Sequence, residues 1–228
     1  MFNFLKPKPA QQRLEIRDTL FGDIPLSRFL LVSPEVLSVE PWASIEHARL
    51  LIDAGDRQGA VEPLRRVLEM PNLESRIYLQ AWRFLREMEV NPPPDQQKLL
   101  LGVVVEVGME KGLDLVAGYS DHSARYYNFS GAGVVWEHPN DSLNGAIEEL
   151  LRVGSTVLQS VGPWEGNRPS APKAGNARVN LLTPSGLHFG QGPLDVLSKD
   201  RLGGSIIASA FRLMQALIQL TKQQPSPS

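Results

Sequence analysis

Three successive prolines divide this sequence into two parts with different hydrophobic periods. They occupy positions 92–94 within NPPPDQQ, residues 91–97. Consecutive prolines cannot continue a helix and favour an extended, stiff connection. Apolar residues recur at helical spacing before this stretch, and β-branched runs typical of strands follow it. The sequence therefore predicts a domain boundary here, with a helical module over 43–92 and an α+β domain over 98–222.

The helical module is predicted to contain three amphipathic helices. Gly55-Asp56 and Pro71-Asn72 interrupt the apolar pattern and predict two short turns. Ala81 follows Ala48 by 33 residues, close to the 34-residue period of tetratricopeptide repeats. Residues 43–89 thus resemble a tetratricopeptide-like helical hairpin of about one and a half repeats. The resemblance implies either a face that packs on the rest of this chain or a surface that binds a partner. The residues that carry the pattern are Ile45, Ala48, Leu51, Ile52, Gly55, Ala60, Val61, Leu64, Val67, Leu68, Ile77, Ala81, Trp82 and Leu85.

The α+β domain is predicted to follow the order β-β-β-β-α-β-β-α. Short links between its first four strands favour an antiparallel meander, and two helices packed on one face are the simplest arrangement. It contains no repeated βαβ unit, which disfavours a doubly wound nucleotide-binding sheet. We expect an irregular N-terminal segment over 1–42 and a disordered tail over 223–228. The expected strands are 99–108, 113–119, 124–129, 134–137, 177–183 and 186–190, and the expected helices are 142–161, with Ser142 as N-cap, and 204–222.

The run SDHS, residues 120–123, places Ser120, Asp121 and His122 side by side, which are the residue types of a hydrolytic triad. Triad members usually come from separate segments, and no GxSxG elbow is present. A two-residue hairpin turn at Asp121-His122 is the better interpretation. It predicts that Tyr119 faces Ala124 and that Ala117 faces Tyr126.

That register would place three further side chains together on the other face of the hairpin. Arg125, Tyr127 and Phe129 would form a cationic and aromatic patch, unless the N-terminal helices cover it. The irregular loop over 162–176 supplies a second candidate surface, because Trp and Arg are favoured interface anchors. The candidate binding residues are therefore Arg125, Tyr127, Phe129, Trp164, Arg168 and Lys173.

Other chemistry has weaker support. The scattered histidines His122, His138 and His188 form no metal-binding motif, and the amides of 201–205 offer a helix start that could hold an anion. The sequence has no cysteine, which excludes disulfides and thiol catalysis. We expect no catalytic residue, no metal and no cofactor.

Composition bounds the remaining functions. The formal net charge of −2 gives no general attraction to nucleic acid. We find no signal peptide or membrane span and expect a cytoplasmic, bacterial-type protein. The broad apolar face of the last helix predicts deep burial or a homodimer. A non-enzymatic adaptor or assembly factor, with a protein partner or self-association, is the favoured function. The alternative is an enzyme or small-ligand or anion-binding protein, with a pocket between the sheet and the 162–176 loop that uses Arg125, Arg168, Arg178 or His188.

Overall fold

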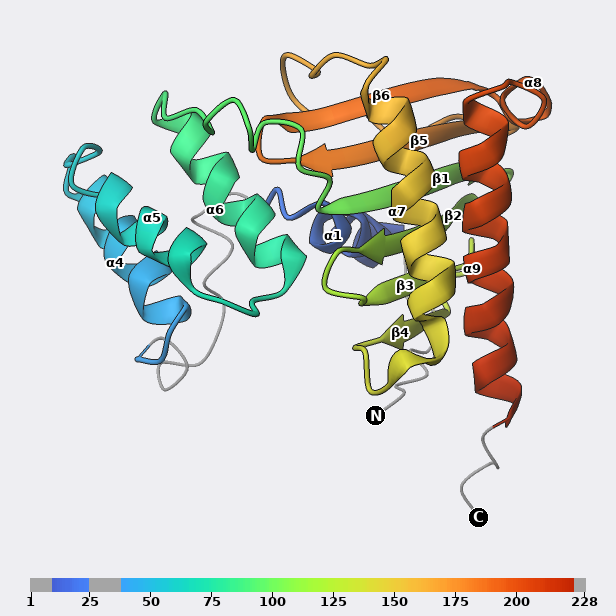
Figure 1. The fold of residues 1–228 in the computed structure, drawn as a ribbon, viewed down its shortest axis with the longest axis horizontal. Helices are drawn as coiled ribbons and strands as arrows, with labels where there is room; N and C mark the ends of the chain where they lie inside the picture. The colour runs from blue at the N-terminus through green and yellow to red at the C-terminus, as the bar shows by residue number, and fades with distance from the viewer. Residues whose placement is uncertain (1–9, 25–37, 224–228) are drawn as a thin grey trace.

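The computed structural model describes residues 10–24 and 38–223, and it has the predicted α+β architecture (Figure 1). The predicted tail, apart from Gln223, lies outside these residues, as do 25–37 of the N-terminal segment. The helices are α1 (Ala10–Phe21), α4 (Trp42–Asp53), α5 (Val61–Glu69), α6 (Ser75–Glu87), α7 (Asn144–Leu158), α8 (Leu194–Leu197) and α9 (Gly203–Gln223), with a 3-10 turn η1 (Asp141–Leu143). The strands are β1 (Gly102–Met109), β2 (Gly112–Tyr119), β3 (Ala124–Tyr127), β4 (Gly133–Trp136), β5 (Asn176–Thr183) and β6 (Gly186–Pro193).

The six strands form one antiparallel sheet in the order β4-β3-β2-β1-β5-β6. The first four strands make the predicted meander, and α7 carries the chain back to the free side of β1. Strand β1 is therefore central, and its consecutive valines Val103, Val104 and Val105 are all buried. A strand that is covered on both faces needs such a continuous apolar run.

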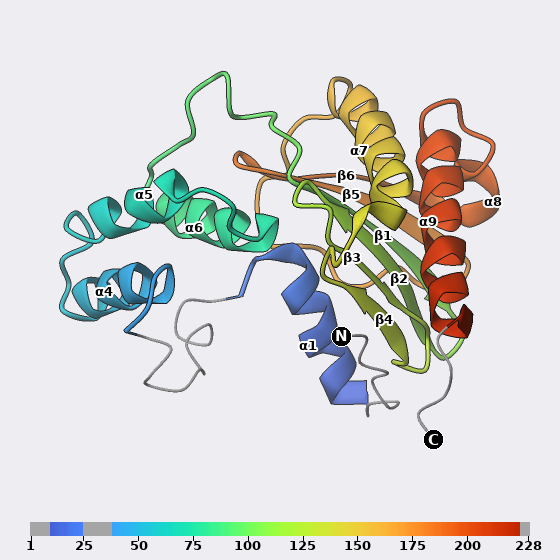
Figure 2. The same ribbon diagram turned by 60° about the horizontal axis from the view of Figure 1, so that its bottom comes forward.

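Helices cover both faces of this sheet (Figure 2). Helices α7 and α9 pack on one face, as predicted, over a core that includes Val103, Val116 and Leu181. On the opposite face, Ile16 and Leu20 of α1 join a second core. The segment over 1–42, which is predicted to hold short helices or extended stretches and to wrap the surface, thus contributes the regular helix α1, which covers the face that would otherwise be open.

The helical module has a core of its own. Helices α4, α5 and α6 pack side by side, with α5 between its two neighbours in contact with both. Their predicted apolar positions are buried among one another, including Ile45, Ala48, Leu64 and Leu85. The turn after α5 lies where the sequence predicts, and α6 ends at Glu87, before the prolines at 92–94.

The β2–β3 hairpin differs from its predicted register by one residue. Gly118 pairs with Ala124, and Ala117 pairs with Arg125. The loop has three residues instead of two: the His122 N–H donates to the Tyr119 carbonyl, and His122 adopts a left-handed φ of 59°. A type I turn followed by a left-handed residue is the usual three-residue hairpin loop. The extra residue turns every side chain of β3 to the other face.

One prediction about helices changes. Asn140, not Ser142, is the capping residue before η1, since its side chain accepts from the Ser142 N–H at 3.0 Å. Of the two alternatives predicted for the apolar face of the last helix, the structure shows burial within the chain, with Ile206, Leu213 and Leu217 of α9 packed against the sheet and α7.

Candidate functional site

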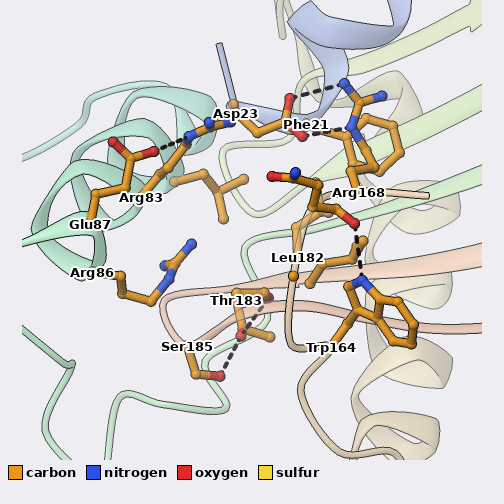
Figure 3. A pocket seen from close by; sticks show the side chains of 16 residues that line it. Phe21, Asp23, Arg83, Arg86, Glu87, Trp164, Arg168, Leu182, Thr183 and Ser185 are labelled. Carbon is orange, nitrogen blue, oxygen red and sulfur yellow. Dashed lines mark hydrogen bonds and ion pairs between the residues drawn. The ribbon is translucent and has the colours of Figure 1, made fainter. Parts of the chain in front are cut away.

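A pocket of about 480 Å³ lies between the helical module and the sheet (Figure 3). Four segments form its walls: helix α6, the residues that follow α1, the loop over 162–176 and the β5–β6 hairpin. We call it the module–sheet pocket. Its volume is within the range of small-molecule sites. Its lining residues are Phe21, Gly22, Asp23, Leu79, Arg83, Arg86, Glu87, Trp164, Gly166, Asn167, Arg168, Leu182, Thr183, Ser185, Gly186 and Leu187.

Helix α6 contributes one stripe of side chains to the pocket. Leu79, Arg83 and Arg86 are four and three residues apart, which places them on one side of a helix. Arg83 forms an ion pair with Glu87 at 2.8 Å. Glu87 also lines the pocket, so both members of this ion pair belong to α6 (Figure 3).

Arg86 is held differently from Arg83. Its Nη1 donates to the Pro184 carbonyl in the β5–β6 turn, and within the described residues it forms no ion pair. A methyl group at Gly186 would lie 3.8 Å from Cζ, Nε and Nη2 alike, so the guanidinium rests on this turn. Burial, reinforced by the like charge of Arg83 and opposed by the carboxylate of Glu87, lowers the pKa of Arg86 to about 10. Arg86 is therefore a partly buried cation that is fixed in place without an ion pair among the described residues.

Arg168 forms the opposite wall and ties the loop to α1. Its guanidinium pairs with Asp23 at 2.6 Å and with Asp18, and it lies 4.3 Å from the centre of the Phe21 ring. Burial raises the pKa of Asp23 despite the opposing effect of Arg168. The charge of Arg168 is thus already matched by carboxylates on the N-terminal segment.

Gly22 lets the chain pass closely between α1 and α6. It has a φ of 59°, and a Cβ there would lie 2.7 Å from the Arg76 carbonyl oxygen and 2.9 Å from the Leu79 Cβ. Only glycine fits this position. The wall formed by Phe21 and Asp23 therefore depends on this residue.

The loop over 162–176 is fixed along its length. The Trp164 backbone N–H donates to the Leu187 carbonyl at 2.7 Å, and its indole N–H donates to the Asn167 carbonyl at 3.0 Å. Its ring meets the Phe189 ring edge-on at 5.1 Å. Trp164 nevertheless remains 47% exposed, so it is an immobilised aromatic surface at the pocket wall.

A polar cluster holds the β5–β6 turn beside the pocket. Ser185 Oγ lies 3.1 Å from His188 Nε2 and donates to the Gln97 carbonyl at 2.7 Å. His188 Nδ1 lies 3.0 Å from the Val161 carbonyl, and the whole residue is buried. Serine and histidine could act as nucleophile and base, but this hydroxyl is committed to a backbone carbonyl. The cluster therefore ties the turn to the linker and to the loop.

A buried ionic network connects α1 to the sheet next to the pocket. Glu106 of β1 is fully buried and pairs with Arg17 of α1 and, at 3.3 Å, with Arg178 of β5. Asn180 donates to the same carboxylate at 3.2 Å. Both arginines also donate to the Pro169 carbonyl in the loop. The network thus links α1, the sheet and the loop over 162–176 beside the pocket.

The predicted surface residues do not form one patch. Arg125 is only 3% exposed and pairs with Glu137, and Tyr127 is buried in the core beneath α1. The hypothesis of an exposed face with these two residues is wrong, and the alternative that an N-terminal helix covers them is confirmed. The register shift places them beside Leu115 and Ala117, on the sheet face where α1 packs. Of the remaining candidates, Trp164, Arg168 and Lys173 lie on the loop over 162–176, and Phe129 lies beyond the end of β3.

Trp164 and Arg168 are the two predicted residues that line the pocket. Lys173 is exposed elsewhere on the loop, and Phe129 is exposed beyond the end of β3. The amides at the start of α9 are already satisfied, since Asp200 Oδ1 accepts from Leu202 and Gly203. They leave no room for the anion considered at this helix start.

Sequence reasoning missed the arginines of α6. The signal available was a pair of cations, Arg83 and Arg86, on a helix whose other inward positions are apolar. Their convergence with Asp23 and Arg168 joins segments that are 60 or more residues apart in the sequence, which no local pattern indicates.

The described residues give no sign of a metal site or a membrane helix. His122 and His138 rings lie 5.1 Å apart, but no group of three histidine, aspartate or glutamate side chains in this part of the chain could hold a metal ion. Within residues 10–24 and 38–223, no helix is both long enough and apolar enough to cross a membrane.

Comparison of this chain with protein-family models, curated proteins and solved structures found no match. The tetratricopeptide-like character of residues 43–89 therefore remains a resemblance.

Proposed function

We propose that this protein binds a small anionic ligand in the module–sheet pocket. The observation that carries the proposal is Arg86, a fixed guanidinium that lines the pocket and forms no ion pair with a carboxylate of the described residues. Removing a cation from water costs free energy unless an anion compensates it. A ligand that supplies the missing negative charge would recover this cost, and its binding would be favoured by the rigid surroundings of Arg86.

The apolar part of the pocket supports a ligand larger than an inorganic ion. Phe21, Leu79 and Leu182 are buried side chains of the wall, and the fixed ring of Trp164 extends the apolar surface toward solvent. Small-molecule sites commonly combine an apolar lining with a few placed polar groups. The pocket therefore fits an anionic group on an apolar body.

A protein partner, which the sequence also predicts, stays a prediction. Two features that favoured it are used inside the chain: the apolar stripes of the helical module form their own core, and α9 packs on the sheet. Trp164, the third feature, lines the pocket.

Isothermal titration calorimetry with phenyl-bearing anions tests the proposal. The panel is phenylacetate, phenylmethanesulfonate and phenyl phosphate, each titrated into wild type, Arg86→Met and the control Arg152→Met. Arg152 lies on the exposed side of α7, far from the pocket lining. We expect at least one anion to bind with a Kd of about 1 mM or below, and Arg86→Met to weaken it about tenfold or more. If Arg86→Met leaves every affinity in the panel unchanged, or no member binds, the proposal is wrong.

A further inference from the structure

The pocket's charges are almost balanced, and this balance restricts the kind of anion. Three arginines and two carboxylates line the pocket. Arg83 is paired with Glu87, and Arg168 is paired with both Asp23 and Asp18. Among the described lining residues, Arg86 is the cation that forms no ion pair. Because Arg168 is already paired with two carboxylates, Arg86 alone is left to pair with a ligand, which favours a ligand with a single negative charge.

A dianion fits this site less well than a monoanion. Its second charge would have no free cation opposite it, and it would lie in the same pocket as the carboxylates of Asp23 and Glu87. Like charges repel strongly where solvent is partly excluded. A phosphate monoester, which carries close to two charges at neutral pH, would meet this repulsion.

The free donors of Arg86 favour a planar group. Nη1 is occupied by the Pro184 carbonyl, and no described residue accepts from Nε or Nη2. These two nitrogens form one edge of the guanidinium fork, with parallel N–H bonds that match the two oxygens of a carboxylate. The contact with the Pro184 turn fixes the plane of the fork, so this edge is ready for a bidentate contact.

We infer that the ligand is a monocarboxylate with an apolar body, bound through the Nε and Nη2 edge of Arg86. Phe21, Leu79, Leu182 and the exposed ring of Trp164 would contact the body. This inference rests on the proposed function and narrows it from anions in general to carboxylates.

The test compares head groups on a constant phenyl body. Calorimetry is carried out with phenylacetate, phenylmethanesulfonate, phenyl phosphate and the neutral phenylacetamide. We expect phenylacetate to bind at least about tenfold more tightly than phenyl phosphate and phenylacetamide, with the tetrahedral sulfonate weaker than the carboxylate. Phenyl phosphate binding more tightly than phenylacetate, with Arg86→Met weakening it, would overturn the carboxylate inference and leave the proposed anion binding intact. If Arg86→Met changes the affinity for none of the four compounds, both the carboxylate inference and the proposed anion binding are wrong.

Arg86→Lys separates charge from geometry. Lysine keeps the positive charge but lacks the planar fork, so phenylacetate affinity should fall about tenfold. Circular dichroism and the unfolding midpoint check that each variant is folded. A lysine variant that binds phenylacetate as tightly as wild type would overturn the bidentate contact.

Discussion

The carboxylate of Asp121, at the tip of the β2–β3 hairpin, accepts a hydrogen bond from the Ser75 backbone N–H at 2.7 Å. Ser75 is the first residue of α6, so a loop of the sheet caps the helix that carries Arg83 and Arg86. The contact is reciprocal, since Ser75 Oγ accepts from the Asp121 N–H at 3.1 Å. The run SDHS, which resembles a triad in the sequence, thus positions the pocket's main helix.

Replacing Asp121 should loosen this contact. Asp121→Ala removes both the acceptor and the negative charge at the helix N-terminus, so we expect a loss of about 1–2 kcal/mol in the free energy of unfolding. Urea denaturation measures it. Asp95→Ala, at an exposed position of the proline linker, is the matched control. An unchanged denaturation midpoint for Asp121→Ala would show that α6 does not need this cap.

The C-terminus of α6 offers a stabilising substitution. The Val90 N–H donates to the Leu85 carbonyl at 2.9 Å, and the Glu89 N–H donates to the Arg86 carbonyl at 3.0 Å. This is a Schellman motif, in which glycine is preferred at the left-handed position, yet Glu89 occupies it with a φ of 63°. Glu89→Gly should therefore raise stability by about 0.5–1 kcal/mol. Glu89→Gln controls for the lost charge and should gain nothing. Destabilisation by Glu89→Gly would contradict this geometry.

Substitution of Glu106 should lower the stability of the fold more than substitution of most other polar residues. Glu106→Gln leaves Arg17 and Arg178 buried without their shared carboxylate, and breaking a buried ion network on one side costs about 3–5 kcal/mol. Thermal and urea unfolding measure the loss. Glu62→Gln, at an exposed position of α5, serves as control and should have little effect. Equal stabilities of the two variants would show that the network does not hold α1.

His188 should make stability depend on pH. Burial lowers the pKa of His188 below its usual 6.5, so the unfolded chain takes up the proton at higher pH than the folded chain does. The contribution of His188 is complete above about pH 6.5 and is lost as pH falls through the folded pKa. The stability difference between wild type and His188→Gln should therefore shrink from pH 8 to pH 5, as measured by urea denaturation. His47→Gln, exposed on α4, is the control. A difference that is constant with pH would contradict a neutral buried His188.

Local patterns were enough to predict the class of this fold and most of its elements, α1 and α8 excepted. The proline break, the helical stripes of residues 43–89 and the valine run of β1 each indicate their structure within a few residues. The hairpin register was not predictable in the same way, because Asp-His fits a two-residue turn about as well as a three-residue loop. That single residue decided which sheet face carries Arg125 and Tyr127, and they lie on the face that α1 covers.

The candidate site depended on contacts that the sequence does not encode locally. Trp164 and Arg168 were identified from an unusual loop, but the partners of Arg168 lie about 150 residues away on and after α1. Arg86 stood out only once the structure showed which neighbouring cations were already paired. Sequence reasoning can thus propose one wall of a pocket, whereas the charge balance across it requires the assembled fold.

Arginine side-chain NMR tests directly whether Arg86 binds the anionic group of the ligand. The Nε–Hε resonance of Arg86, assigned by its loss in Arg86→Lys, is followed during titration of the wild-type protein with phenylacetate. If Arg86 binds the anion, this resonance should show a saturable shift and its proton should exchange more slowly with water, while the Arg152 resonance stays unchanged. A saturable titration in which the Arg86 resonance does not move, or the absence of any saturable shift, would contradict the assignment of Arg86 as the anion-binding group.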